Sequence, residues 1–461
     1  MSGDAATGAR APLEPPRSRS RPHAALTMAL YQLVFLIGFC CYLPVLLWRA
    51  VFDARYRRGF RQRMGGVRIE RRSAAVVWIH GVSVGEIKAA TNIIARLRQD
   101  RPDLQIVLSS TTPNGHQVAR QEHGDLEVVF YPLDFGPFPG RALDRVRPQC
   151  VLLMELEIWP NFLQAAASRR IPVAVINGRI SESTYRGYRR ARGLLPQLDS
   201  IHLYCVQDAA YQKRLLDLGV DPRRVFVTGN MKYDSVVMGQ APPGDTLRGW
   251  LAPDDRIVLV AGSTHADEEA WLCEAVAPIG PPGGSASGPR VRLVLVPRHP
   301  ERAGSVCDAV RQAGRVAVRW SETDEGARSL RRDAVLVVDT IGQLQRFYAA
   351  CDIAFVGGSL VPHGGQNMLE PAAQGRAVVF GPHTFNFRTD VELLLRAEAA
   401  VQVADREQLA ACLAELCRRV DLRDALGERA RAVIRANQGA TQRTLDHIGQ
   451  LLGAPVADSV P

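Results

Sequence analysis

A chain of 461 residues with 46% hydrophobic side chains is longer than one hydrophobic core usually serves, so a small one-domain protein is excluded. Its net charge of +10 comes almost entirely from residues 1–72, which hold 13 arginines against four acidic residues. The remaining chain is nearly neutral, and this excludes the basic folded domain that a nucleic-acid partner would need.

The N-terminal region predicts a membrane anchor. Residues 1–23 are rich in Ala, Pro, Ser and Arg and indicate a disordered basic extension. Residues 24–48 carry no charge and are long enough to cross a hydrocarbon core of about 30 Å, although Pro44 leaves open a helix lying in the membrane interface. The basic juxtamembrane segment 49–72 has more arginines than the extension, so the positive-inside rule places the large domains in the cytoplasm, against anionic lipids.

Short apolar segments then alternate with helical patterns. In the first half, buried strands are predicted at residues 74–79, 106–109, 127–131, 150–154, 171–176, 202–206 and 225–228. This alternation predicts a parallel sheet covered by helices on both faces. We assign residues 73–237 to an N-terminal Rossmann-like domain and the Gly/Pro-containing residues 238–245 to a linker.

The same alternation resumes after the linker. Strands are predicted at residues 257–261, 291–296, 334–338, 353–356 and 377–380. Residues 246–461 are therefore predicted to form a second doubly wound domain that includes the C-terminal helices. Ligands of such sheets bind beyond the carboxyl ends of the strands, so we expect the site in a cleft between the two domains.

Three polar residues of the first half follow predicted strands. Glu86 begins a helix, where it faces unpaired backbone N–H groups and the positive end of the helix dipole; it is a candidate base for a hydroxyl nucleophile, with helix capping as the alternative role. Glu155 lies just beyond the strand at 150–154, and either it or Glu157 could instead cap the next helix. Lys232 follows the last strand and could neutralise a departing phosphate.

The second half carries groups that suit a nucleotide at several strand ends. Residues 261–269 run from a strand into a helix start and predict an anion-binding helix N-terminus. Arg298 could bind a phosphate, and Asn367 and Glu370 would share one face of a helix that follows a glycine-rich loop. No P-loop motif, DxD pair or His/Cys ligand cluster occurs, and the nine cysteines show no zinc spacing, so no metal site is expected.

In these stretches the sequence resembles the 3-deoxy-D-manno-octulosonic acid (Kdo) transferases of lipopolysaccharide synthesis. The resemblance extends from about residue 28 to the C-terminal helices. It is carried by residues 82–86, 154–155 with 159–161, Asn177 with Arg179 and Ser181, 228–229 with Lys232, 296–302, 355–360, Gly365 with Asn367, Leu369 and Glu370, and 381–387.

The resemblance implies a GT-B glycosyltransferase, with an acceptor-binding N-terminal and a donor-binding C-terminal Rossmann-like domain, held at the cytoplasmic side of the inner membrane. The donor would be CMP-Kdo, a substrate, and the acceptor the tetraacyl precursor of lipid A, with no cofactor or metal. Glu86 would accept the proton of the acceptor hydroxyl during direct, inverting attack. Glu155 and Lys232 would stabilise the transition state.

The same resemblance implies the donor contacts. Those to CMP would be Pro297, Arg298, Ile341, Gly342, Gln343, Asn367, Met368, Leu369 and Glu370. Arg179, Arg186, Arg189 and Arg190 are candidates for the acceptor phosphates. Two alternatives remain open: another GT-B nucleotide-sugar enzyme, with a different donor or as an epimerase, and a membrane-tethered binding protein on a degenerate transferase scaffold.

Overall fold

The computed structural model of the chain describes residues 59–452 except 74, 193–195, 240–245, 254–255, 280–290, 324–329 and 332, together with a few residues between 31 and 52. Among the residues described, no helix is long and apolar enough to cross a membrane. The predicted extension at 1–23 lies outside them, as does most of the predicted anchor at 24–48. Of the anchor residues described, Tyr31 donates a hydrogen bond from its hydroxyl to Asp134 Oδ2 (2.9 Å).

The chain divides into two compact units, and the first contains a seven-stranded parallel sheet. Its strands are β1 (Ala75–Gly81), β2 (Leu104–Ser110), β3 (Glu127–Phe130), β4 (Cys150–Met154), β5 (Val173–Gly178), β6 (Leu203–Val206) and β7 (Val225–Val227), in the order β3-β2-β1-β4-β5-β6-β7. All seven strands predicted in this half are present.

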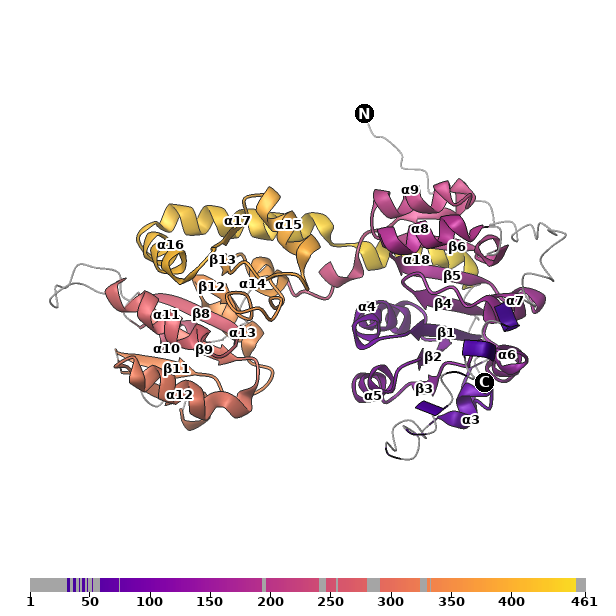
Figure 1. Cartoon of the computed structure of the whole chain (residues 1–461), viewed down its shortest axis with the longest axis horizontal. Helices are drawn as coiled ribbons and strands as arrows, with labels where there is room; N and C mark the ends of the chain where they lie inside the picture. Colours follow the sequence, from indigo (N-terminus) through magenta and orange to yellow (C-terminus); the bar gives the residue numbers. More distant parts are fainter. Residues whose placement is uncertain are drawn as a thin grey trace. The chain divides into compact units, whose positions relative to one another are not determined.

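Helices cover both faces of this sheet (Figure 1). They are α3 (Phe60–Arg63), α4 (Val84–Asp100), α5 (Pro113–Glu122), α6 (Phe138–Val146), α7 (Pro160–Ser168), α8 (Glu182–Arg190), α9 (Ala209–Asp217) and α18 (Ala440–Ile448). Trp78 and its face of the sheet pack against α6, α7 and α9, whereas Ile79 and the opposite face pack against α4, α5 and α18. Burial on both faces explains why the strand sequences are almost continuously apolar.

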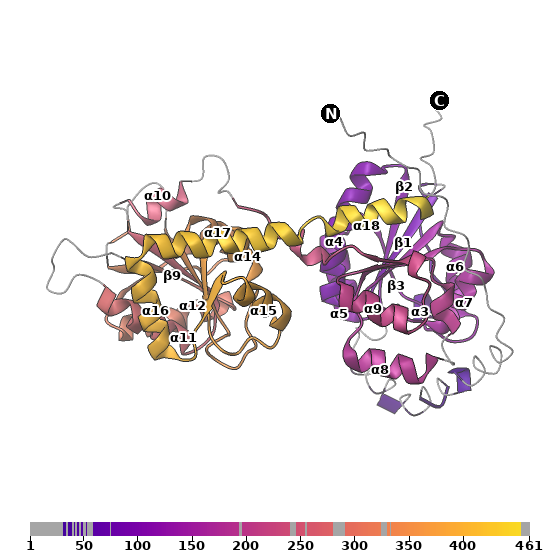
Figure 2. The same cartoon turned by 90° about the horizontal axis from the view of Figure 1, so that it is seen from above.

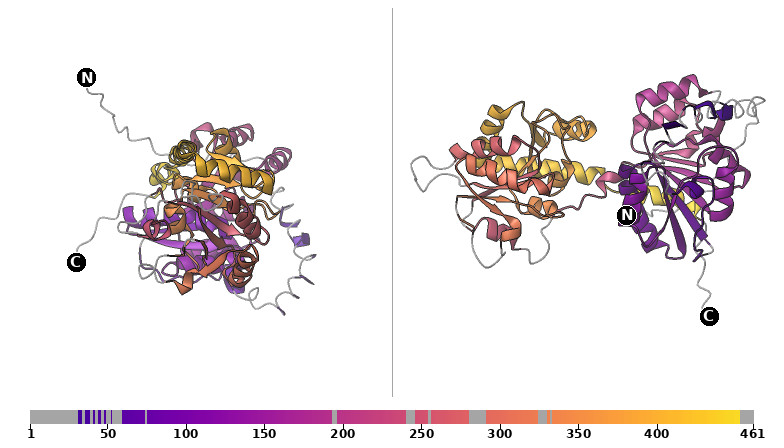
Figure 3. Two further views of the ribbon diagram at one scale, coloured as in Figure 1. Left: turned by 90° about the vertical axis from the view of Figure 1, so that its left-hand side faces the viewer. Right: turned by 60° about the horizontal axis from the view of Figure 1, so that its bottom comes forward.

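The second unit also contains seven parallel strands with helices on both faces (Figure 3). The strands are β8 (Ile257–Thr264), β9 (Val291–Pro297), β10 (Val316–Arg319), β11 (Ala334–Val337), β12 (Ile353–Val356), β13 (Ala377–Phe380) and β14 (Ala400–Gln402), in the order β10-β11-β9-β8-β12-β13-β14. The helices are α10 (Leu247–Leu251), α11 (Glu268–Val276), α12 (Ala303–Gln312), α13 (Leu344–Ala350), α14 (Leu369–Ala373), α15 (Arg388–Arg396), α16 (Arg406–Arg418) and α17 (Val420–Asn437).

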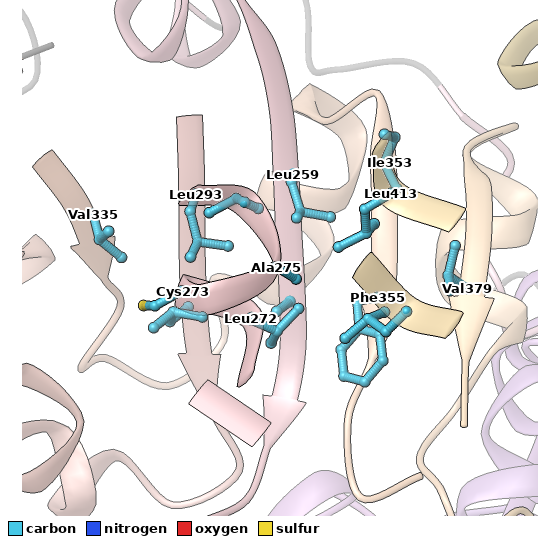
Figure 4. Packing of buried hydrophobic residues seen from close by; sticks show 14 of the residues in the cluster. Leu259, Leu272, Cys273, Ala275, Leu293, Val335, Ile353, Phe355, Val379 and Leu413 are labelled. Atoms are coloured by element: carbon cyan, nitrogen blue, oxygen red, sulfur yellow. The ribbon is translucent and has the colours of Figure 1, made fainter. Parts of the chain in front are cut away.

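Two strands of the second unit, β10 and β14, were not predicted. Both lie at the edges of the sheet, where a strand has a neighbour on one side only. Most of their side chains are partly buried or exposed, unlike those of the central strands. The centre of the sheet is fully buried, and Figure 4 shows Leu259, Leu293 and Phe355 packed against α11 and α16. A strong apolar signal therefore marks the middle of the sheet and not its edges.

The structure differs from the predicted domain boundaries at the C-terminal end. Residues 438–452 belong to the first unit, not to the second, and Figure 2 shows α18 beside the strands of that unit. Ala440, Leu445 and Ile448 of α18 lie in the first unit's core. Asp234 fixes this helix, because its carboxylate accepts the backbone N–H groups of Gly439 and Thr441 (both 2.6 Å). The chain thus passes between the units twice, after Ser235 and after Asn437.

Candidate active site

The candidate acid–base residues of the first unit lie where its strand order reverses. Strands β1 and β4 are neighbours, although β2 and β3 separate them in the sequence. The connections that leave their carboxyl ends therefore run in opposite directions, and ligands of such sheets bind at this point. Glu86 follows β1, and Glu155 and Glu157 follow β4.

Glu86 is only 8% exposed and is held by the turn that precedes its helix. Its Oε2 accepts the backbone N–H of Val82 (2.9 Å), and its Oε1 accepts the backbone N–H (3.2 Å) and the hydroxyl (2.8 Å) of Ser83. The Ser83 hydroxyl in turn accepts the backbone N–H of Glu86, which completes a capping box. Glu86 therefore has the predicted capping role, and the same contacts fix the direction of its carboxylate.

Glu155 sits at a strained backbone position. Its φ of +55° lies in the left-handed region that a side chain with a Cβ rarely adopts, a feature that clusters at functional sites. Burial raises the pKa of its carboxyl, the guanidinium of Arg179 (3.3 Å) lowers it, and the charge of Glu86 raises it. Glu86 and Glu155 are thus close enough to interact, because they follow the neighbouring strands β1 and β4.

Glu157 is the third carboxylate of this group, and its pKa is strongly raised. Burial, followed by the charges of Glu86 and Glu155, raises the pKa of Glu157 from 4.5 to about 7. The N-terminus of helix α7 is capped by Asp134, whose carboxylate accepts the backbone N–H groups of Asn161 (3.0 Å) and Phe162 (2.7 Å). Neither Glu155 nor Glu157 therefore has the alternative capping role. The group of Glu86, Glu155 and Glu157 is called the carboxylate cluster below.

Replacement of Glu157 by Gln is expected to stabilise the protein at pH 8 by on the order of 1 kcal/mol and to have no effect at pH 4.5. Because the folded-state pKa is raised, the native protein binds the proton more tightly than the unfolded chain, and its stability decreases as the pH rises from 4.5 to about 7. Denaturant unfolding at both pH values measures the difference, with exposed Glu122→Gln as the control. Equal stabilisation at both pH values would contradict the raised pKa.

Lys232 lies in a short helical turn that follows β7. Asn177 accepts the backbone N–H of Met231 through Oδ1 (3.1 Å), and its own carbonyl accepts the side-chain amide of Gln207 (3.0 Å). Gln207 also accepts the side-chain amide of Asn230, whose Oδ1 caps the backbone N–H of Lys232. This network anchors the turn at the same edge of the sheet as the carboxylate cluster.

The four candidate acceptor arginines do not form one group. Arg179 pairs with Glu155, and Arg186 pairs with Glu182 on α8 (3.0 Å). Arg189 lies over the ring of Tyr185 at 5.6 Å, and Arg190 follows it at the end of α8. No side chain of α8 is buried, so the helix presents its arginines to solvent.

In the second unit the strand order reverses between β8 and β12, and a buried carboxylate occupies this point. Glu268, which is 0% exposed, accepts backbone N–H groups from four residues. The donors are His265 (2.9 Å) and Gly358 (2.8 Å) to Oε2, and Ser359 (3.1 Å) and Leu360 (3.0 Å) to Oε1. Burial raises the pKa of Glu268, although these four hydrogen bonds lower it.

Residues 261–269 were predicted to form an anion-binding helix N-terminus, and two of the chain's own carboxylates lie in this stretch. Glu268 accepts N–H groups of His265 and of the loop after β12, and Glu269 pairs with Arg302 (3.0 Å). These N–H groups do not belong to α11, so the anion site at the helix N-terminus stays a prediction. The carboxylate of Glu268 shapes the glycine-rich loop.

The residues predicted to contact CMP lie on three connections of the second unit. Pro297 ends β9 and Arg298 follows it, with an exposed side chain. Ile341, Gly342 and Gln343 join β11 to α13, and Ile341 is 87% exposed. Asn367 donates its side-chain amide to Glu370 (2.9 Å) and accepts the backbone N–H of Leu369, whereas Met368 is buried.

Sequence reasoning missed two residues of these sites. Glu268 was overlooked because two consecutive acidic residues at a helix start usually face solvent, and only the approach of β12 shows that this one is buried. Gln207 carries no charge and follows β6, which ends at the same edge of the sheet. Its place directly after a buried parallel strand is the signal that could have identified it.

The comparisons with known proteins agree on one family. A family model described as 3-Deoxy-D-manno-octulosonic-acid transferase (kdotransferase) matches residues 58–235. The chain is 34% identical over 419 residues to a 3-deoxy-D-manno-octulosonic acid transferase of Bordetella pertussis, covering 88% of this chain and 93% of that protein. It is also 34% identical over 374 residues to the enzyme of the same name from Haemophilus influenzae, covering 80% and 86%.

A solved structure extends the likeness of the fold to both units. The crystal structure of an Anabaena protein in complex with UDP is similar over 82% of this chain and 99% of that one, with a TM-score of 0.50 and 13% sequence identity. At this identity the likeness shows the fold alone. The chain has the two-unit α/β architecture of the GT-B class, as the resemblance in sequence implied.

Proposed function

Because the chain belongs to the 3-deoxy-D-manno-octulosonic acid (Kdo) transferase family, we propose that it transfers Kdo from CMP-Kdo to a sugar hydroxyl of the tetraacyl precursor of lipid A. The observation that supports this most directly is the carboxylate cluster at the reversal of strand order in the first unit. A transferase that activates a hydroxyl can use a fixed carboxylate as its base, and Glu86 is held at this point by three hydrogen bonds.

In the proposed reaction Glu86 is the general base. The acceptor hydroxyl gives its proton to Glu86 while its oxygen forms a bond to the anomeric carbon of Kdo. The bond from that carbon to the phosphate oxygen of CMP breaks at the same time, and CMP leaves with the electron pair. Since attack and departure use opposite faces of the carbon, the configuration inverts.

Two further residues stabilise the developing charges in this proposal. Lys232, anchored by the Asn177 network, supplies positive charge to the departing phosphate. Glu155, at its strained backbone position, acts on the reacting sugar. The proton goes to Glu86 and CMP is the leaving group, so the step balances without a cofactor or metal ion.

We assign donor binding to the second unit and acceptor binding to the first. Arg298, the segment 341–343 and the segment 367–370 would bind CMP, since the first offers an exposed guanidinium and the last carries the Asn367–Glu370 pair. The exposed arginines of α8 would meet the acceptor phosphates. An acylated acceptor also suits residues 24–48 as an inner-membrane anchor beside anionic lipids, with both units in the cytoplasm.

The test is turnover of purified full-length protein with CMP-Kdo and the tetraacyl precursor, followed by mass spectrometry of the lipid. We expect a mass increase by one or more Kdo residues and an equal molar release of CMP. UDP-N-acetylglucosamine in place of CMP-Kdo is the control donor, and it should give no product. Turnover of the control donor alone would favour the alternative of a different nucleotide-sugar enzyme.

A further inference from the structure

Three histidines of the second unit gather at the carboxyl ends of its central strands. His265 follows β8, His299 follows β9 and His363 lies in the loop after β12. The rings of His265 and His363 stack with centroids 4.1 Å apart and planes at 17°, and the ring of His299 lies 6.2 Å from that of His265 at 83°. We call these three residues the histidine cluster.

His265 is the inner member of the cluster. Its Nε2 atom is buried and has no hydrogen-bond partner among the described residues. It lies against Gly358, where an added Cβ would approach within 3.3 Å and where φ is +64°. A buried ring nitrogen without a partner costs free energy, so it points to a group that completes the site.

Two arginines, Arg298 and Arg302, bring positive charge to the cluster. Burial first, and then the neighbouring His363, Arg302, His299 and Arg298, lower the pKa of His265 from 6.5 to about 4. Three carboxylates lie nearby, but two are engaged elsewhere. Glu269 pairs with Arg302, Glu268 accepts only backbone N–H groups, and Glu301 stands 3.6 Å from His299.

Such a set of donors suits an anion better than a metal ion. The side chains of Arg298, His299 and His363 are exposed, so they can reach a ligand. Within the described residues, no group of three His, Cys, Asp or Glu side chains could hold a metal ion. Ring N–H and guanidinium groups bind phosphate and carboxylate oxygens through charge-assisted hydrogen bonds.

We propose that the histidine cluster and Arg298 form a subsite for an anionic oxygen group of the donor, either its phosphate or the carboxylate of its sugar acid. This rests on the proposed use of CMP-Kdo as donor. The subsite lies beside the loop that Glu268 holds, so His265 and Gly358 are fixed by the same carboxylate. The bound anion supplies the acceptor that Nε2 of His265 lacks.

Proton uptake follows from this arrangement. His265 is neutral at pH 7 in the free protein, because its pKa is about 4. An anion against the ring favours the protonated form, so binding raises the pKa and takes up a proton. Affinity for the anionic ligand therefore increases as the pH falls from 7 towards 4 through His265, and this increase is absent from a variant without the ring.

The test is calorimetric titration of the full-length protein with cytidine, CMP and free Kdo, and determination of the KM for CMP-Kdo. The variants are the double substitution His299→Ala/His363→Ala, which alters exposed side chains, and His265→Asn. Arg311→Gln, an exposed arginine of α12 paired with Asp308, is the control. Titrations of CMP in two buffers of different ionisation enthalpy at pH 7 measure the protons taken up.

The outcomes of these measurements show which group of the donor binds at the subsite. If the phosphate binds, the double variant weakens CMP binding about tenfold or more and leaves cytidine binding unchanged. If the carboxylate binds, CMP affinity stays while the KM for CMP-Kdo rises and binding of free Kdo is lost. Wild-type protein also takes up more protons with its anionic ligand than His265→Asn does.

Two results would overturn different claims. Unchanged affinities for CMP and Kdo and an unchanged KM for CMP-Kdo in both variants would remove the subsite while leaving the proposed donor intact. Absence of any binding of cytidine, CMP or CMP-Kdo to the wild-type protein would instead remove the proposed donor. Circular dichroism of each variant confirms that it is folded before either conclusion is drawn.

Discussion

Replacement of Glu86 by Gln is expected to lower the rate of Kdo transfer by about 10²- to 10⁴-fold and to leave CMP binding unchanged. The amide cannot accept the proton of the acceptor hydroxyl, whereas its size and position are nearly those of the carboxylate. Initial rates with saturating CMP-Kdo, together with calorimetric titration of CMP, separate a loss of chemistry from a loss of donor binding. Normal turnover by the variant would show that another group is the base.

The capping contacts of Glu86 require a matched control. Its carboxylate accepts the N–H groups of Val82 and Ser83, so the Gln variant also loses part of the capping box. Ser83→Ala removes the cap from the other side, at a cost of about 1 kcal/mol in stability, and keeps the carboxylate. We expect Ser83→Ala to retain most of the activity. An equal loss of activity in both variants would assign the effect to the helix start.

Glu157 is the residue to examine if Glu86→Gln remains active. A carboxyl with a pKa of about 7 exchanges protons readily at neutral pH. The charge of Glu86 is one cause of that value, so the neutral Gln side chain at position 86 should also lower the pKa of Glu157. The pH profile of the residual activity therefore reports which of the two carboxylates accepts the proton.

Much of the fold could be predicted because buried parallel strands are apolar on both faces. The central strands of each sheet were predicted from this signal, and Glu86 and Glu155 were placed beyond two of them. The structure adds that these two strands, β1 and β4, are neighbours. Strands β10 and β14 were not predicted, because neighbouring strands and helices cover an edge strand only in part. Their short and partly exposed sequences do not stand out from a loop.

The return of α18 to the first unit could not be predicted from its periodicity. An apolar stripe shows that a helix packs against something, but not against which sheet. The specific contact is the carboxylate of Asp234, some 200 residues earlier in the chain, which accepts the N–H groups at the start of α18. Contacts between such distant residues depend on the tertiary structure and leave no local pattern.

Glu268 is the clearest case of a functional position hidden from the sequence. The stretch at 261–269 has the small residues and helix start of an anion site, so the sequence predicted the binding of an external anion there. The structure supplies an internal one, because β12 brings the N–H groups of Gly358, Ser359 and Leu360 onto the carboxylate.

Replacement of Glu268 by Ala is accordingly expected to lower the free energy of unfolding by about 2 to 4 kcal/mol and to weaken CMP binding at least about tenfold. Four backbone N–H groups lose the carboxylate that accepts them, and a cavity replaces a side chain that is 0% exposed. The loop from Gly357 to Leu360 then loses the contact that fixes its distance from β8. Chemical denaturation measures the first effect and calorimetric titration with CMP the second.

The control is Glu274→Ala, which removes an exposed carboxylate from the same helix and should change neither quantity measurably. Glu268→Gln provides an intermediate case, because an amide oxygen can accept hydrogen bonds but the amide nitrogen cannot accept the N–H groups that faced the second carboxylate oxygen. Stability should therefore fall in the order wild type, Gln, Ala.

If stability follows this order while CMP affinity stays constant in folded protein, Glu268 supports the sheet but does not position the donor loop. If stability does not change in either variant, the four hydrogen bonds contribute no net free energy, and the loop owes its shape to its glycines and to the hydroxyl of Ser359, which accepts the backbone N–H of Gly381 (2.8 Å).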